Sequence, residues 1–191
     1  ALLALVFAFA LGVASMVGYN AGKIRSPLVV FLHGYGADGA DLLGLADPLA
    51  PHLPNTVFMS ADAPSPCAGN PFGRQWFPIP RFDGSTEVEA AVEMNRAAED
   101  LNAFLDQRLA EEGLTPAALA LVGFSQGAMM SLHVAPRRGQ PMAGVVAISG
   151  KLMLPKLLAE EAKVKPPIML IHGDRDDVVP FQEMQAAGNA L

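Results

Sequence analysis

The sequence predicts an α/β fold in which a mostly parallel central sheet is covered by helices on both faces. Several short runs are apolar throughout, as expected of strands that are buried on both sides: 28–32, 56–59, 119–122, 143–148 and 168–171. Segments with helical spacing of apolar residues separate these runs along the chain. Apolar strands that alternate with helices indicate a parallel sheet between two helical layers.

Composition narrows the classes of function. The 191 residues fit one domain with a sizeable core, with 51% of them hydrophobic and 17% charged. The net charge is −6 and the basic residues are scattered, which argues against a nucleic-acid partner. Cys67 is the only cysteine, and its loop-like, Pro-rich surroundings are a poor setting for a nucleophile. No pattern calls for a metal or an organic cofactor.

Residues 1–24 form an apolar N-terminal segment, and the domain is expected to occupy residues 25–191. The first 22 residues carry no charge. As one helix they would be about 33 Å long, enough to cross a bilayer core. Two interpretations stay open: a signal segment or anchor that contacts a membrane, or a segment packed on the domain. The cellular location stays open with them.

A glycine-rich turn, residues 33–39, follows the first apolar run. Leucines at helical spacing then predict a helix from Asp41 to Ala50, with Asp38 or Asp41 as its cap.

The stretch from Ala61 to Gly84 is expected to be long and irregular, because it is rich in Pro and Gly. Its many aromatic residues argue against disorder and suggest the wall of an apolar pocket. A satellite core beneath a loop is the alternative.

The longest helix is predicted to begin after Thr86, which forms a capping box with Glu89, and to end at Gly113. A stripe at i, i+3 and i+4 spacing is expected to face the core: Met94, Ala97, Ala98, Leu101, Phe104, Leu105 and Leu109. A short charged helix is expected at 156–163.

A Gly-x-Ser-x-Gly sequence, residues 123–127, lies between an apolar strand and a segment with helical character. In that context the motif predicts a nucleophile elbow. The glycines on either side of Ser125 let the strand and helix backbones pass closely, and the strained turn lifts the hydroxyl clear of the sheet. The amide of Gln126 would then face a developing oxyanion. The alternative is an ordinary glycine-rich loop.

Three acidic residues, Asp174, Asp176 and Asp177, crowd one turn after the strand at 168–171. Open α/β sheets place their sites at the carboxyl ends of strands. A carboxylate there can hold a histidine in the correct tautomer for catalysis. Asp-rich turns also commonly bond only to backbone amides, and the turn alone leaves both interpretations open.

Four motifs occur together in this chain, in a fixed order: VFLHGYGADG (30–39), QWFPI (75–79), GFSQG (123–127) and HGDRDDVVP (172–180). With them the chain resembles the phospholipase/carboxylesterase family of α/β-hydrolases, which includes bacterial carboxylesterases and acyl-protein thioesterases. The resemblance runs from about Leu28 to Leu191. It implies the α/β-hydrolase fold and hydrolysis of small-molecule carboxylic esters, of short to medium acyl length, through an acyl-enzyme.

The resemblance also implies residue roles. Ser125 is the implied nucleophile, and Asp176, four residues after His172, is the implied triad acid. The implied oxyanion donors are the backbone amides of Tyr35 and Gln126.

The substrate is expected to contact Trp76, Phe77 and Met129. Thioesterase or lysophospholipase activity with the same triad is an alternative. The oligomeric state, including a homodimer, stays open.

The sequence departs from the family pattern at both ends. The family's histidine follows its aspartate by a few tens of residues, but no histidine follows Asp176 here, and the four present do not fit the order Ser, Asp, His: His33, His52, His133 and His172. At the other end, an apolar run replaces the family's short strand pair. The expectation is a truncated domain that lacks its last strand and helix and is almost inactive as it stands. A non-catalytic binding protein of the same fold is the alternative.

Overall fold

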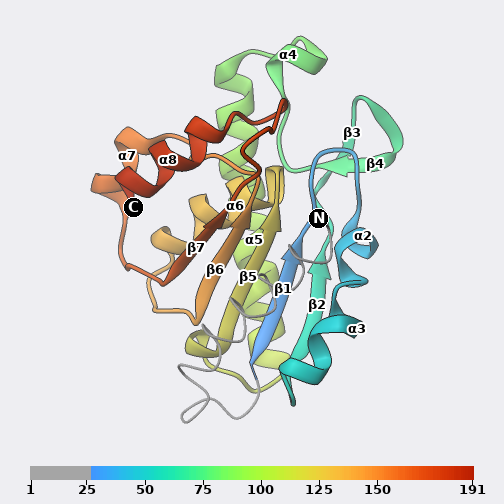
Figure 1. Ribbon diagram of the computed structural model, residues 1–191, viewed down its shortest axis with the longest axis vertical. Coiled ribbons are helices and arrows are strands. Elements are labelled where there is room, and N and C mark those ends of the chain that lie inside the picture. Colours follow the sequence, from blue (N-terminus) through green and yellow to red (C-terminus); the bar gives the residue numbers. More distant parts are fainter. Residues whose placement is uncertain (1–26) are drawn as a thin grey trace.

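The computed structural model describes residues 27–191, and the predicted N-terminal segment, residues 1–24, lies outside them. Five strands form one sheet in the order β2-β1-β5-β6-β7, and every neighbouring pair is parallel (Figure 1). The strands are β1 (Leu28–Leu32), β2 (Val57–Ala61), β5 (Leu119–Phe124), β6 (Gly144–Ile148) and β7 (Ile168–Ile171). The predicted α/β fold is thus confirmed.

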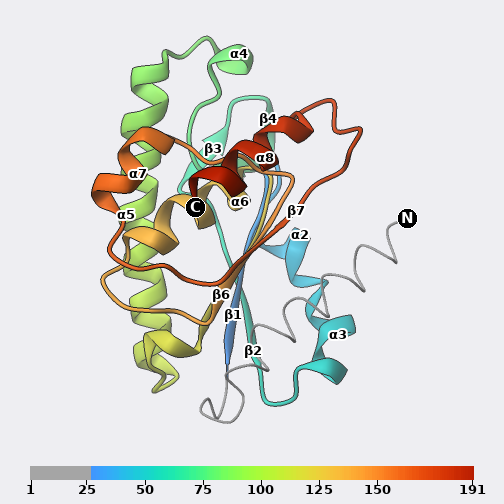
Figure 2. The same cartoon turned by 60° about the vertical axis from the view of Figure 1, so that its left-hand side comes forward.

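Both faces of the sheet are covered, which explains why its strands are apolar apart from Ser60 in β2. Alternate strand residues such as Val30 and Leu121 pack beneath α5 (Glu87–Glu111) and α6 (Gln126–Val134). Their neighbours, such as Phe31 and Val122, face the opposite layer, which contains Leu49 and Leu53. Figure 2 shows the sheet edge-on between these two layers.

The opposite layer departs from the predicted single helix at 41–50. It consists of α2 (Gly39–Leu43), α3 (Ala46–Leu49) and the 3₁₀ helix η1 (Ala50–His52). Gly44 is the C-cap of α2 and interrupts the helix. Asp38 is the cap, and its carboxylate accepts from the Ala40 amide at 2.9 Å.

The longest helix, α5, agrees with the sequence. Thr86 Oγ1 accepts from the Glu89 amide at 3.1 Å, and the Glu89 carboxylate accepts from the Thr86 amide at 2.7 Å, which completes the capping box. Gly113 adopts a φ of 63°, beyond the end of the helix. The predicted stripe is buried except for Phe104, which is half-buried.

The prediction of an irregular stretch at 61–84 was wrong. It contains an antiparallel hairpin, β3 (Ser65–Cys67) and β4 (Asn70–Gln75), and a short helix, α4 (Pro80–Asp83). The strands are short and each contains a proline, so neither the residue pattern nor the length of the runs signals them.

The last helices are α7 (Pro155–Glu161) and α8 (Phe181–Ala190), and the sequence had indicated only the first of them. Two further 3₁₀ helices are η2 (Pro116–Ala118) and η3 (Ala135–Arg137). Within residues 27–191, no helix combines the length and the apolar character that a membrane span requires.

Candidate active site

Ser125 forms the sharp turn between β5 and α6, with φ 53° and ψ −115°. This is a strained conformation for a residue with a side chain. The flanking glycines are sterically required. A Cβ on Gly123 would lie 2.3 Å from the Gly127 carbonyl oxygen, and a Cβ on Gly127 would lie 1.9 Å from the carbonyl oxygen of Leu32. The strand, the turn and the helix therefore have the arrangement of a nucleophile elbow.

A pocket of about 480 Å³ opens at the carboxyl ends of the strands, beside Ser125. A volume of this size suits a small organic ligand. Ser125 shares its lining with both predicted oxyanion residues, Tyr35 and Gln126, and with the predicted contact residues Phe77 and Met129. The structure therefore brings five of the sequence-predicted residues to one cavity.

His33 holds the turn that carries Tyr35, a contact that the sequence analysis missed. The buried ring accepts the Ala63 N–H at Nε2 (3.0 Å), so its proton is on Nδ1, which donates to the Gly34 carbonyl oxygen at 2.8 Å. That carbonyl belongs to the same peptide group as the Tyr35 N–H. Fixing one end of this planar group fixes the direction of the other.

Tyr35 contributes a side chain as well as an amide to the site. Its ring lies 5.7 Å from that of Phe82, and both residues line the pocket. Burial, together with the neighbouring Cys67 thiol, raises the pKa of the Tyr35 phenol to about 12. The phenol therefore stays protonated and neutral at physiological pH.

The side chain of Gln126 joins the elbow to the wall of the pocket. Its Oε1 accepts from the Trp76 amide at 3.0 Å, and its Nε2 donates to the Phe77 carbonyl oxygen at 2.7 Å. Both bonds are buried. The residue whose amide is the predicted oxyanion donor thus also fixes the backbone of Trp76 and Phe77.

The structure does not place Trp76 where the sequence suggested. Its side chain is 2% exposed and lies in the core, outside the lining of the pocket. The indole Nε1–H donates to the His33 carbonyl oxygen at 2.9 Å, and the two rings lie 5.6 Å apart. A buried indole needs a partner for its N–H, and this one is found beneath the turn that carries Tyr35. Trp76 therefore supports that turn, and Phe77 faces the cavity.

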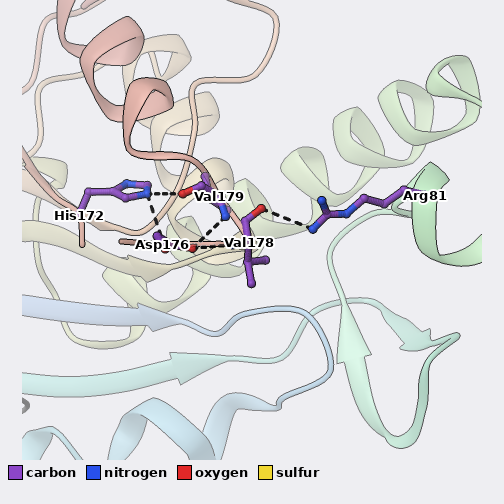
Figure 3. A network of polar contacts seen from close by, with 5 residues as sticks. All are labelled: Arg81, His172, Asp176, Val178 and Val179. Carbon is purple, nitrogen blue, oxygen red and sulfur yellow. Dashed lines mark hydrogen bonds and ion pairs between the residues drawn. The ribbon is translucent and has the colours of Figure 1, made fainter. Parts of the chain in front are cut away.

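Asp176, in the loop after β7, lies beside His172, Val178 and Val179 (Figure 3). It is partly buried, whereas Asp174 and Asp177 are exposed. Its Oδ1 accepts from the amides of Val178 and Val179, both at 2.9 Å. Bonding to backbone amides was the alternative interpretation of this Asp-rich turn, and the carboxylate does make such bonds. They fix its position.

Although burial opposes the charge on Asp176, the pKa of its carboxyl lies below the ordinary value. The amides of Val179 and Val178, the Ser149 hydroxyl and His172 together outweigh the burial. His172 Nε2 lies 3.6 Å from Asp176 Oδ2 and donates to the Val179 carbonyl oxygen at 2.7 Å. The carboxylate is therefore ionised at neutral pH.

Arg81, on α4, reaches the same loop. Its Nη2 donates to the Val178 carbonyl oxygen at 3.4 Å, as Figure 3 shows. Arg81, Val178 and Val179 all line the pocket, so this bond connects two of its walls.

Among the residues that line the pocket there is no histidine. His33 lies under the turn that carries Tyr35, His52 belongs to η1, and His172 is held in the loop of Asp176. His133 is buried on α6, where burial and the charge of Arg137 lower its pKa to about 4. That none of the four is the triad base, as chain order predicts, stays a prediction.

The model of the phospholipase/carboxylesterase family matches residues 18–191. The chain belongs to this family. The esterase YpfH of Escherichia coli (strain K12) is 30% identical over 169 residues, which are 88% of this chain and 70% of that protein. Acyl-protein thioesterase 1 of Saccharomyces cerevisiae is 32% identical over 164 residues, which are 80% of this chain and 71% of that protein.

A solved structure agrees with this assignment. The crystal structure of esterase PE8 superposes with a TM-score of 0.81 and 43% sequence identity, and the match covers 86% of this chain and 76% of that one. The phospholipase/carboxylesterase assignment makes the chain a hydrolase of the carboxylesterase type, with the α/β-hydrolase fold.

Proposed function

We propose that this protein hydrolyses carboxylic esters of short to medium acyl length through an acyl-enzyme on Ser125. The observation that carries the proposal is the position of Ser125. It sits in a strained turn, on the wall of a cavity that is also lined by Tyr35 and Gln126. The conformation of φ 53° and ψ −115° costs of order 1–3 kcal/mol, and it places Ser125 on the wall of the cavity.

The reaction has two acyl transfers. Ser125 Oγ attacks the carbonyl carbon while a histidine takes the hydroxyl proton, and the amides of Tyr35 and Gln126 stabilise the resulting oxyanion. When the intermediate collapses, the histidine returns its proton to the departing alcohol. Water then attacks the acyl-enzyme, again with the histidine as base, and releases the acid.

Asp176 is proposed to orient that histidine. Its carboxylate is fixed by two amides and is ionised at neutral pH, as a group that stabilises an imidazolium must be. The four histidines of this chain lie outside the lining of the pocket.

The test compares hydrolysis of nitrophenyl acetate, butyrate and octanoate by the full-length protein, by Ser125→Ala and by Ser85→Ala. Removal of a triad nucleophile costs about 10⁶ in kcat in a well-studied protease, so Ser125→Ala is expected to reduce the rate to background. Ser85 lies outside the proposed machinery, and its variant is expected to keep the rate. Equal rates for the unaltered protein and Ser125→Ala would overturn the assignment.

A fluorophosphonate probe distinguishes an enzyme from a binding protein of the same fold. Such probes form a bond with an activated serine, so we expect one label, at Ser125. A folded full-length protein that stays unlabelled would support the binding protein instead.

Thioester hydrolysis is the second candidate, because a relative that is 32% identical is named acyl-protein thioesterase 1. The same groups perform both reactions. The ratio of kcat/KM for an acyl thioester and the matched oxygen ester decides between them.

A further inference from the structure

The turn that carries Tyr35 is bound on its outer side by the β3–β4 hairpin. The Gly36 amide donates to the Arg74 carbonyl oxygen at 2.9 Å, and the Arg74 amide donates to the Ala37 carbonyl oxygen at 2.8 Å. The turn therefore pairs with β4 as a further short strand would. This contact joins the oxyanion turn to an element outside the main sheet.

Asn70, at the start of β4, adds a side-chain bond to this pairing. Its Nδ2 donates to the Gly36 carbonyl oxygen at 2.8 Å, and its Oδ1 accepts from the Phe72 amide at 3.1 Å. The two bonds require opposite ends of the amide, so together they define its orientation. One side chain thus connects the bend of the hairpin to the oxyanion turn.

Gly73 allows the two backbones to approach. A Cβ at this position would lie 2.1 Å from the Gly36 carbonyl oxygen and 2.4 Å from its carbonyl carbon. Both atoms belong to the backbone, so no side-chain rotation could relieve the clash. Any larger residue at this position would push the hairpin and the turn apart.

These contacts fix the backbone on both sides of Tyr35. His33 holds the Gly34 carbonyl, which lies in the peptide group before the Tyr35 Cα. Arg74 holds the Gly36 N–H, which lies in the peptide group after it. Two fixed planes leave the φ and ψ of Tyr35 no freedom, and so they determine where its N–H points.

We propose that Asn70 and Gly73 are positioning residues for the oxyanion hole. They hold the Gly36 carbonyl group and the close approach of β4, and the Arg74 carbonyl of β4 holds the Gly36 N–H in the peptide group next to Tyr35. This inference rests on the proposed function, in which the Tyr35 N–H stabilises the oxyanion. Neither residue lines the pocket. They are expected to affect the transition state more than substrate binding. If the N–H donor is displaced by a fraction of an ångström, the substrate still binds, but the oxyanion is stabilised less well.

Asn70→Asp tests the idea with the smallest change. Aspartate keeps an acceptor for the Phe72 amide but loses the donor to the Gly36 carbonyl, and its charge repels that oxygen. Loss of an oxyanion donor costs about 10²–10³ in kcat, so we expect a misdirected one to lower kcat at least tenfold, with KM changed less than twofold. Asn70→Ala is expected to act in the same direction. Gly73→Ala is expected to give a larger loss.

The control is Phe72→Ala in the same hairpin. Its ring is 91% exposed, and the variant keeps the Phe72 amide that bonds to Asn70, so we expect full activity. Urea unfolding of each full-length variant shows whether it is folded, and Asn70→Asp carries the test if Gly73→Ala does not fold.

A readout specific for the oxyanion hole is the inhibition constant of a trifluoromethyl ketone, which forms a tetrahedral oxyanion on the serine. We expect it to rise by the same factor by which kcat/KM falls. Folded Asn70 variants that keep kcat within twofold, or that raise KM at constant kcat, would overturn the inference. Failure of the proposed function gives a different result, which is unchanged hydrolysis by Ser125→Ala.

Discussion

The Trp76 amide donates to Gln126 Oε1 at 3.0 Å, although the two residues are 50 positions apart in the chain. Through this bond and its partner at the Phe77 carbonyl, one side chain connects the elbow to the pocket wall. The direction in which Phe77 faces the cavity therefore depends on the residue that follows the proposed nucleophile.

We expect Gln126→Ala to lower the free energy of unfolding by about 2–4 kcal/mol, because it leaves two buried main-chain groups without partners. The main-chain amide of residue 126 is retained, so KM should rise more than kcat falls as the wall loosens. Urea unfolding and steady-state kinetics measure the two effects. Gln126→Glu keeps the acceptor for Trp76 but places a carboxylate oxygen against the Phe77 carbonyl in a site that is 1% exposed, so it should destabilise at least as much as Gln126→Ala.

Substitution of Gly127 by a larger residue is expected to have a large steric effect. A Cβ there would lie 1.9 Å from the Leu32 carbonyl oxygen, so β1 and α6 would have to separate. We expect Gly127→Ala to lower stability by at least about 3 kcal/mol, toward the upper range for point mutations. The matched control is Gly139→Ala, because no atom lies within 4 Å of a Cβ built at Gly139. Similar thermal unfolding of both variants would contradict the prediction.

Because of His133, the folded protein is expected to lose stability in mild acid. His133 is 4% exposed, and burial and Arg137 lower its folded pKa to about 4 from 6.5, with Glu161 acting weakly in the opposite direction. Between these values the unfolded chain binds a proton that the folded chain does not, so stability falls as the pH falls. The expected loss is about 2 kcal/mol between pH 7 and pH 5, approaching about 3 kcal/mol near pH 4.

The variant His133→Leu isolates this contribution. Nδ1 of the ring is buried and has no partner among residues 27–191, so leucine removes no bond at that atom. Urea unfolding at pH 7 and pH 5 should show a difference smaller by about 2 kcal/mol in the variant than in the unaltered protein. The same pH dependence in both proteins would assign the effect to other groups.

Asp176→Asn separates charge from shape in the acid loop. Asparagine keeps an oxygen for the amides of Val178 and Val179 but cannot stabilise an imidazolium. In the full-length protein we expect kcat to fall about 10⁴-fold, as for the same change in a serine protease triad, with the fold retained. Circular dichroism checks the fold. An unchanged rate would remove Asp176 from the proposed triad.

The acid loop also has its own pH dependence. The folded pKa of Asp176 is lower than the unfolded one, so its charge stabilises the fold at neutral pH. That contribution is lost as the pH falls through the folded value. Asp176→Asn should therefore reduce acid destabilisation below about pH 4, which urea unfolding measures.

The amino-acid pattern alone was sufficient to predict the parallel sheet, the capping box of α5 and the turn at Ser125. These features depend on neighbours in the chain. A strand buried on both faces must be apolar, a capping box spans four residues, and Gly123 lies close in the chain to the Gly127 backbone that it accommodates.

The core position of Trp76 and the bonds made by His33 and Gln126 could not be inferred in this way. Each depends on a partner far along the chain, such as the Ala63 amide for His33, 30 positions away, and the Trp76 amide for Gln126. Hydrophobic periodicity indicates which side of an element is buried, but it does not say which buried polar group meets which. Only the packed chain decides that pairing, because a buried donor must find its acceptor wherever the fold brings one.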